Sequence, residues 1–228
     1  MSMPTPSLSN LMVFRIEHIG NLEYILQNGM FTRAHAAVNP DHVFIGHAQL
    51  TANRHGWPVK PIDHTGLDSY GTLGDYVPFY FGPRSPMLYV IKNGYQGVTK
   101  RDQREIVYLC CRFRAIAESG VRFAFTDGHA KNEFTAFYSN TENLDKLHWE
   151  TIYSRFWNNR EEELDRERRK QAEMLVYNHV PPDWIEAVVV YDAEMCNFAE
   201  TLIKQANHNA KVRINPTDAY NSCGFYYP

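Results

Sequence analysis

A lone carboxylate late in the chain stands where a basic segment gives way to an apolar run. Residues 169–176 read Arg-Lys-Gln-Ala-Glu-Met-Leu-Val, and Glu173 is the only acid among them. The apolar run has to be buried, so the fold must place Glu173 at the edge of a packed core, beside cations that keep it ionised at neutral pH. Such an acid is suited to stabilising positive charge. The alternative is an ordinary surface ion pair, because Glu173 follows Arg169 at a helical spacing of four residues.

The composition indicates a globular protein with a substantial core. The chain has 228 residues, of which 44% are hydrophobic, a fraction that is ordinary for folded domains. Lys and Arg number 23 against 26 for Asp and Glu, so any contact with nucleic acid must come from a local basic face. Because no linker, repeat or low-complexity segment interrupts the chain, we expect one α+β domain over residues 1–228.

The cysteines and the chain start bear on where the protein is found. Two of the four cysteines are adjacent, at Cys110 and Cys111, and this spacing does not suit the disulfide framework of a secreted protein. The first ten residues have neither the basic nor the apolar segment of a signal peptide. No apolar run approaches the roughly 20 residues that span a bilayer. These features predict reduced thiols and a cytoplasmic protein without membrane association.

Hydrophobic periodicity and turn residues predict a chain rich in strands through its middle. Strands are expected at 11–16, 75–82, 87–92, 104–112, 121–126, 173–177 and 187–191. Helices are expected at 21–28, 113–120, 141–170 and 199–206, with the third exposed on most of its faces. Pro78 lacks the N–H that a central strand donates, which favours an edge or bent position for its strand. The irregular segment 31–72 is long enough to indicate a functional or mobile loop.

Metal and common nucleotide-binding motifs are absent from the sequence. Five histidines lie at positions 35, 42, 47, 55 and 64, but their spacings match no compact zinc pattern, and neither HExxH nor CxxC occurs. There is also no GxGxxG after a strand and no phosphate loop of the GxxxxGK type. We therefore expect no metal, and any nucleotide must bind in another way.

A second candidate site follows the strand predicted at 121–126. Asp127, Gly128 and His129 come directly after Thr126, so a titratable ring and a carboxylate stand at a strand end, where loops commonly carry function. The alternative is a simple turn in which Asp127 binds the backbone of the next residues. Taken with Glu173, His129 could also form a general acid and base pair that cleaves RNA without NAD.

Five groups of residues match, in order, the sequence pattern of a known family. They are 15–22 (RIEHIGNL); 45–47 with Arg54 and 56–59 (GWPV); 76–81 (YVPFYF) with 85–87; 125–127 with 129–130; and 171–173 (QAE). Together they span roughly residues 13 to 190. On these residues the chain resembles DarT, bacterial toxins that ADP-ribosylate DNA bases from NAD and are neutralised by the macrodomain antitoxin DarG.

The resemblance implies an ADP-ribosyltransferase fold, in which a bent, split β core with peripheral helices clamps NAD as a co-substrate. It implies catalytic roles for Glu173 and Arg54, an NAD-binding loop at about 38–56 and a substrate loop at about 126–173. The implied NAD contacts are Arg15, Ile16, Glu17, Tyr24, Thr32 and Arg54. Some family members have His-Ile-Thr where this chain has Arg15-Ile16-Glu17, so this corner differs in its side chains.

The resemblance further implies that the acceptor is a base of single-stranded DNA, with thymine favoured over guanine, and that modification blocks replication. The segment 126–173 offers aromatic rings interleaved with basic side chains, a combination that binds single strands by stacking and phosphate contacts. About half of these rings are expected to face the core. The expected DNA contacts are His129, Tyr138, Arg166 and Arg169. A catalytically silent single-strand-binding module is a third alternative, which predicts DNA binding without a change in its mass.

Overall fold

The computed structural model describes residues 3–217 and 224–228. Its strands are β1 (Met12–His18), β2 (Met30–Phe31), β3 (Tyr76–Tyr80), β4 (Ile106–Arg112), β5 (Phe123–Thr126), β6 (Phe137–Tyr138), β7 (Glu173–Tyr177), β8 (His179–Val180), β9 (Ile185–Val190) and β10 (Lys211–Ile214). Its α-helices are α1 (Leu22–Asn28), α2 (Ala48–Ala52), α3 (Pro86–Asn93), α4 (Phe113–Glu118), α5 (Trp149–Tyr153), α6 (Arg166–Lys170) and α7 (Ala193–Gln205).

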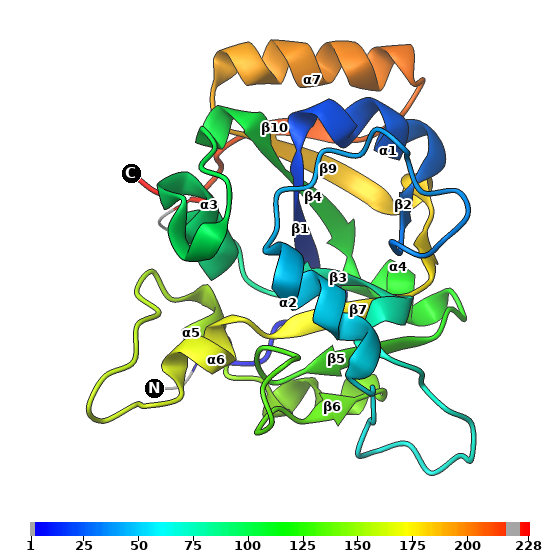
Figure 1. Ribbon diagram of the computed structural model, residues 1–228, viewed down its shortest axis with the longest axis vertical. Coiled ribbons are helices and arrows are strands. Elements are labelled where there is room, and N and C mark those ends of the chain that lie inside the picture. Colours follow the sequence, from blue (N-terminus) through cyan, green and yellow to red (C-terminus); the bar gives the residue numbers. More distant parts are fainter. Residues whose placement is uncertain (1–2, 218–223) are drawn as a thin grey trace.

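A mostly antiparallel sheet forms the centre of the molecule, with helices at its periphery (Figure 1). The strand order is β10-β9-β4-β1-β3-β7-β5-β6, and β2 pairs with β8 in a small second sheet. Within this order β10 runs parallel to β9, and the other neighbouring strands are antiparallel. The predicted α+β class with peripheral helices is confirmed.

The sheet opens between its two central strands. β1 stays in register with β4 along its whole length, and β3 does the same with β7, but β1 and β3 pair only at Phe14 and Tyr80. Beyond that pair the two strands diverge, and the Arg15 side chain donates a hydrogen bond to the Pro78 carbonyl across the gap, at 3.0 Å. The sheet is therefore split, and the gap leaves room for a cavity.

The strand that carries Pro78 lies inside the sheet, between β1 and β7, so the edge alternative of the predicted edge or bent position is excluded. The N–H and carbonyl of one extended residue point to the same side of a strand, and the Pro78 carbonyl faces β1. The missing N–H of Pro78 therefore lies on the side where β1 and β3 have separated. An interior strand tolerates proline here because no ladder hydrogen bond is needed at that position.

Both faces of the part of the sheet that contains β4 and β1 are covered by other elements. β4 is apolar on both sides, and its residues from Ile106 to Cys111 are buried. One face packs against α1 and α7, which lie together at the top of Figure 1. The other face packs against α3 and the residues around Phe225. Burial on both faces fixes β4 and β1 as a rigid wall behind the split.

Two predicted elements differ in the structure. Residues 87–92, predicted as a strand, belong to α3, which begins after Ser85 caps the Leu88 N–H and ends at Gly94 in the left-handed region. The predicted helix 141–170 is broken into a short 3-10 helix (Thr141–Lys146), α5 and α6. Two of its basic residues, Arg166 and Lys170, are buried and do not face solvent.

The buried ammonium group of Lys170 explains why this end of the segment turns inward. Its Nζ donates hydrogen bonds to the carbonyls of Ile152 at 2.5 Å, Ser154 at 3.1 Å and Pro83 at 3.3 Å. These carbonyls belong to the end of α5, the residues after it, and the loop after β3. Lys170, which lies shortly before β7, thus connects the end of α5, the residues that follow α5 and the loop after β3.

Other predictions about the chain fall partly outside the described residues. Cys110 and Cys111 are buried free thiols and Cys196 is a partly exposed one, whereas Cys223 lies outside the described residues. Burial raises the pKa of the Cys110 thiol above its usual range. Within the described ranges, no helix has the length and apolar content required to traverse a bilayer.

We expect Lys170→Met to lower the free energy of unfolding by about 2 kcal/mol, because the charged donor is lost while three buried carbonyls lose a partner. Urea denaturation followed by circular dichroism measures this change. Lys146→Met is the matched control, since the Lys146 ammonium is exposed and pairs with the exposed carboxylate of Asp145. Equal unfolding free energies for the two variants would contradict the prediction.

Candidate active site

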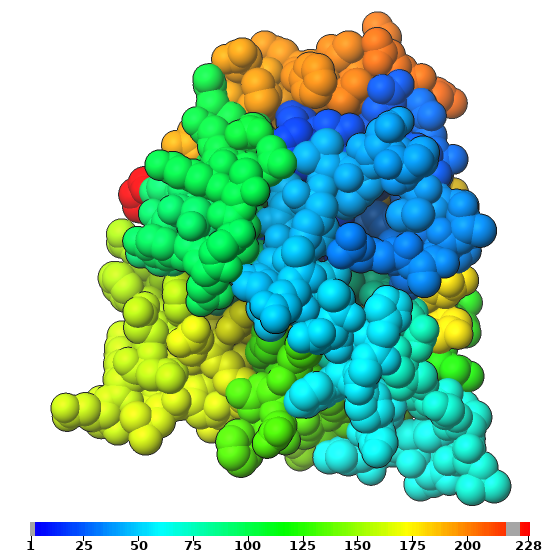
Figure 2. Space-filling view, viewed as in Figure 1, coloured from blue at the N-terminus to red at the C-terminus, as the bar shows by residue number. Residues whose placement is uncertain are grey.

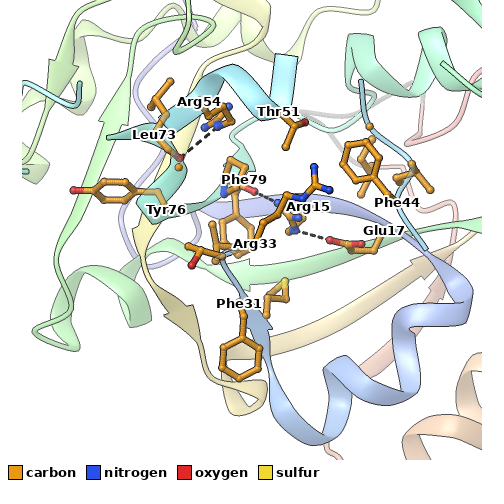
Figure 3. A pocket seen from close by; sticks show the side chains of 18 of the residues that line it. Arg15, Glu17, Phe31, Arg33, Phe44, Thr51, Arg54, Leu73, Tyr76 and Phe79 are labelled. Atoms are coloured by element: carbon orange, nitrogen blue, oxygen red, sulfur yellow. Dashed lines mark hydrogen bonds and ion pairs between the residues drawn. The ribbon is translucent and has the colours of Figure 1, made fainter. Parts of the chain in front are cut away.

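A cavity of about 230 Å³ occupies the split between β1 and β3. Its walls come from those strands, from α1, from the segment 29–47, and from α2 with the 3-10 helix Asn53–Gly56 that follows it. The molecular surface is hollowed beside the blue N-terminal segments (Figure 2). Figure 3 shows the Arg15 side chain among the lining residues, with Glu17 beside it.

Glu173 lines this cavity, and both of its carboxylate oxygens accept hydrogen bonds. It is the first residue of β7 and lies opposite Tyr80 of β3. One oxygen, Oε2, accepts a hydrogen bond from Arg54 Nη2 at 3.1 Å. The other, Oε1, accepts from the backbone N–H of Ala130 at 2.9 Å. The carboxylate is buried, with a side-chain exposure of 4%, and its orientation is fixed by two donors, one to each oxygen.

The backbone of Glu173 is fixed by a buried hydroxyl. Glu173 N donates to Thr126 Oγ1 at 2.9 Å, and Thr126 Oγ1 donates to the Gly128 carbonyl at 2.6 Å. Thr126 ends β5 and is fully buried. The start of β7 and the turn after β5 are therefore joined through one side chain, as the predicted proximity of Glu173 and the 126–129 turn requires.

The other side of the cavity contains a second arginine–carboxylate pair. Arg15 Nε contacts Glu17 Oε1 at 2.7 Å, and the Glu17 side chain is 4% exposed. Asn21 donates to Glu17 Oε2 at 3.2 Å and exchanges two further hydrogen bonds with the backbone of Val43. His42 lies 3.7 Å from Glu17 Oε2. This network fastens the predicted NAD-binding loop to β1.

The segment after α1 forms the rim of the cavity. The Tyr24 hydroxyl donates to the Ala37 carbonyl at 2.6 Å, and the Thr32 N–H donates to the Asn178 carbonyl at 3.0 Å. The Phe31 ring stacks on the His35 and His179 rings. The Arg33 guanidinium lies 4.7 Å from the centre of the Phe44 ring. Flat aromatic faces and cations thus line the rim, where a planar or anionic group can bind.

Two titratable groups beside Glu173 have shifted pKa values. Burial, followed by the Glu173 charge, raises the pKa of Tyr80 to about 12. Burial lowers the pKa of His129 below its usual 6.5, although the Glu173 charge opposes this shift. At neutral pH the Tyr80 hydroxyl is therefore a hydrogen-bond donor and the His129 ring is neutral. A neutral ring can accept a proton or a hydrogen bond at the cavity mouth.

All predicted NAD contacts line this one cavity. They are Arg15, Ile16, Glu17, Tyr24, Thr32 and Arg54, and they share it with Glu173 and His129. Sequence reasoning missed Tyr80, Ala130 and the Phe31 stack. Tyr80 and Ala130 both lay within matching motifs, but the position of Tyr80 opposite Glu173 depends on strand register, and Ala130 donates through its backbone N–H.

Three predicted DNA contacts lie away from the cavity lining. The Tyr138 ring is buried and stacks on Phe125. Arg166 donates to Glu163, the Phe156 carbonyl and Ser154 Oγ, and Arg169 pairs with Asp165 at 2.9 Å. The contacts of Arg166 and Arg169 hold the segment 154–169 together. DNA contact by these three residues stays a prediction.

The aromatic rings of the predicted substrate loop divide between core and surface. Phe137, Tyr138 and Trp149 are buried, while Phe134 is 85% exposed and Phe156 is 61% exposed. Tyr153 and Trp157 are partly buried.

No group of three or more metal-ligating side chains is found among residues 3–217 and 224–228.

Comparison with known proteins gives one consistent result. Residues 14–221 match the family model described as "DarT: ssDNA thymidine ADP-ribosyltransferase, DarT". A "DNA ADP-ribosyl transferase" of Escherichia coli O127:H6 is 35% identical over 86% of this chain and 87% of its own length. One from Thermus aquaticus is 34% identical over 94% and 89%. A fusion of a DNA ADP-ribosyl transferase with a DNA ADP-ribosyl glycohydrolase, from Thermosipho africanus, is 25% identical over 90% of this chain and 48% of its own length.

Solved structures agree with the sequence comparison. Thermus sp. 2.9 DarT in complex with ADP-ribosylated ssDNA superposes with a TM-score of 0.81 at 30% identity, covering 94% of this chain and 97% of that one. The same protein in complex with NAD+ gives a TM-score of 0.72, covering 92% and 98%.

We expect acidification from about pH 7.5 to about pH 5.5 to lower the free energy of unfolding. Burial lowers the pKa values of His42, His129 and His148 in the folded protein. The unfolded chain therefore binds more protons once the pH falls below 6.5, and stability is lost from that pH downward. Urea unfolding across this range measures the slope, which His129→Gln should reduce. The carboxylates with lowered pKa values act only below about pH 4.5. A slope unaltered by His129→Gln would refute the assignment.

Proposed function

The chain belongs to the DarT family of NAD-dependent DNA ADP-ribosyltransferases, and from that premise we propose that it transfers ADP-ribose from NAD to thymine in single-stranded DNA. The observation that carries the proposal is the contact between Glu173 and Arg54 inside the cavity at the sheet split. The reaction breaks the bond between nicotinamide and ribose and forms a bond from the sugar carbon to a base nitrogen.

Glu173 supplies the fixed negative charge for this reaction. Breaking the glycosidic bond leaves oxocarbenium-like positive charge on the ribose, and a preorganised carboxylate in a water-poor cavity stabilises it. The nitrogen of the acceptor base loses a proton as it bonds to the sugar. Glu173 is the base we assign to that proton, because its carboxylate lines the cavity that the acceptor base must enter.

Arg54 is the residue that we assign to orienting both Glu173 and the bound NAD. Its hydrogen bonds to Glu173 and to the Leu73 carbonyl use Nη2 and Nε, which leaves further guanidinium N–H groups for an anion. Arginine can therefore orient Glu173 and grip the NAD diphosphate at the same time, and a lysine lacks the planar fork that this requires. Arg15 places a second guanidinium on the same cavity, where its partners Glu17 and Pro78 orient it.

We assign the single-stranded DNA that accepts ADP-ribose to the side of the cavity bordered by the segment 127–136. His129 and Lys131 line the cavity there, and the Phe134 ring is exposed nearby in sequence. An enzyme acting on a base needs it unstacked, which a single strand offers at little cost. Thymine is favoured over guanine because the matching family is described by thymidine. The RNA-cleaving alternative needs no NAD and does not fit a family of ADP-ribosyltransferases.

The biological role follows the same premise. We propose that the protein is a cytoplasmic toxin whose modification of DNA blocks replication, and that a DarG-type macrodomain antitoxin neutralises it. The fusion of a relative to a DNA ADP-ribosyl glycohydrolase supports the pairing of the two activities. In enzyme terms the reaction is a pentosyl transfer, of the glycosyltransferase class.

Four oligonucleotides that each contain one type of base test the acceptor directly. Incubation with NAD, followed by mass spectrometry, should add ADP-ribose to the thymine oligonucleotide alone. Addition to the guanine oligonucleotide would change the assigned base. Shortened RNA in a parallel reaction without NAD would favour the rival enzyme, and DNA binding without any mass change would favour the silent module.

We expect Glu173→Gln to reduce the turnover number roughly 1,000-fold, because the amide keeps the shape of the side chain but removes the charge that stabilises the transition state. NAD affinity, measured by calorimetry, should be retained. Glu186→Gln is the control, since Glu186 is half-exposed and pairs with Arg112 on another part of the sheet. A Glu173→Gln protein as active as this control would count against the proposed mechanism.

Arg54→Ala should lower kcat/KM by roughly 100-fold or more, and Arg54→Lys should recover only part of the loss, because a point charge does not replace a fork. Kinetics at varied NAD concentration measure both. Arg114→Lys serves for comparison, as Arg114 forms an exposed pair with Glu118. Full activity of Arg54→Lys would show that the planar fork is not required.

A further inference from the structure

The segment 127–136 carries two groups that meet Glu173 at the cavity. The Ala130 N–H donates to Glu173 Oε1, and His129 lines the same cavity. Because the Ala130 donor belongs to the backbone, the orientation of the carboxylate depends on where the backbone of this segment lies. A residue that fixes the segment therefore also affects Glu173.

Arg168 contacts this segment at Asp127, His129 and Thr135. Its Nη1 and Nη2 donate to the Asp127 carboxylate at 2.8 and 3.3 Å, and Nη1 also donates to Thr135 Oγ1 at 3.1 Å. Its backbone carbonyl accepts from the His129 N–H at 2.9 Å. The segment is thus bound to one residue at three places along its length.

The same guanidinium is fastened on its other edge. Nε and Nη2 donate to the two oxygens of Asp165, each at 2.7 Å. The Arg168 side chain is 9% exposed, and a Cβ added to Gly128 would lie 2.4 Å from its Nη1. Two bidentate carboxylate contacts use the full planar fork of arginine, which lysine cannot reproduce. Arg168 is therefore held rigidly and packs directly on the backbone before His129.

We propose that Arg168 is a positioning residue for ADP-ribosyl transfer: it locks the segment 127–136 onto α6 so that the Ala130 N–H keeps the Glu173 carboxylate in its reactive orientation. Arg168 is not among the described residues that line the cavity, so it acts through the segment and not by touching substrate. The inference rests on the proposed function, in which Glu173 stabilises the sugar cation.

The test compares Arg168→Gln and Arg168→Lys with a matched control. Arg112→Gln removes another arginine that binds a carboxylate through two nitrogens, Glu186 at 2.6 Å for both, at the far end of β4. We expect Arg168→Gln to lower kcat roughly 100-fold, the cost of a small misplacement of a catalytic group. Arg168→Lys should recover part of it. NAD affinity should remain at the wild-type level, because the NAD contacts come from other segments.

Hydrogen–deuterium exchange gives a readout that is independent of catalysis. The peptide covering 127–136 should exchange faster in Arg168→Gln than in the wild type, while peptides from β1 should not change. Wild-type kcat in Arg168→Gln would overturn the proposal. A parallel loss of kcat and NAD affinity, matching the loss of folded protein, would also overturn it, since that pattern indicates a general structural role.

Asp127→Asn provides a second variant that keeps the size of the side chain, so it decides the question if Arg168→Gln does not fold. The effects of Asp127→Asn and Arg168→Lys on kcat should be less than additive, because both act on one contact. Additive effects would contradict a shared role. If the wild type modified a base other than thymine, the assigned acceptor would fail, but kcat on that base would still test Arg168. If it modified no DNA, exchange alone would decide whether Arg168 holds the segment.

Discussion

The buried carboxylate of Glu173 is the constraint on which the rest of the structure depends. A charge removed from water is tolerated only with partners, and removing one partner of such a pair typically costs about 3–5 kcal/mol, a large part of the roughly 5–15 kcal/mol by which a domain is stable. Glu173 has two donors, Arg54 and Ala130, which belong to segments far apart in the sequence. The fold therefore has to bring the 3-10 helix at 53–56 and the turn after β5 together at the start of β7. Both segments contribute residues to the lining of the cavity.

Sequence reasoning recovered the elements whose pattern is local. The strands around 106–112 and 173–177 are long apolar runs, and α1 ends at Gly29 as predicted. The run 87–92 was misread because a short apolar stretch has no decisive period. Its helical state is set by the Ser85 cap, the proline at its start and the left-handed Gly94 at its end. Capping residues outside the run would have corrected it.

The sequence predicted those parts of the candidate site that are made by side chains. It did not predict the parts that depend on backbone position or strand register. Glu173 and Arg54 were named from motifs, and the structure places them in contact. Ala130 and Tyr80 lay within matching motifs but were given no role, because one acts through its backbone and the other through strand register. Lys170 and Arg168 had been read as part of an exposed charged helix. Their burial follows from partners at 83, 127 and 152–154, which no local pattern reveals.

The split in the sheet coincides with a residue that cannot donate a backbone hydrogen bond. β3 presents the edge of Pro78 toward β1, and proline has no N–H, so a ladder between the two strands would lack a hydrogen bond at this point. The Pro78 carbonyl would then lack a partner, and the Arg15 guanidinium supplies one at 3.0 Å. Arg15 is in turn oriented by Glu17, whose own oxygens contact Asn21 and thereby the loop at Val43. Pro78 thus lies where the two strands separate, and Arg15 satisfies its carbonyl and connects the split, through Glu17 and Asn21, to the loop at Val43.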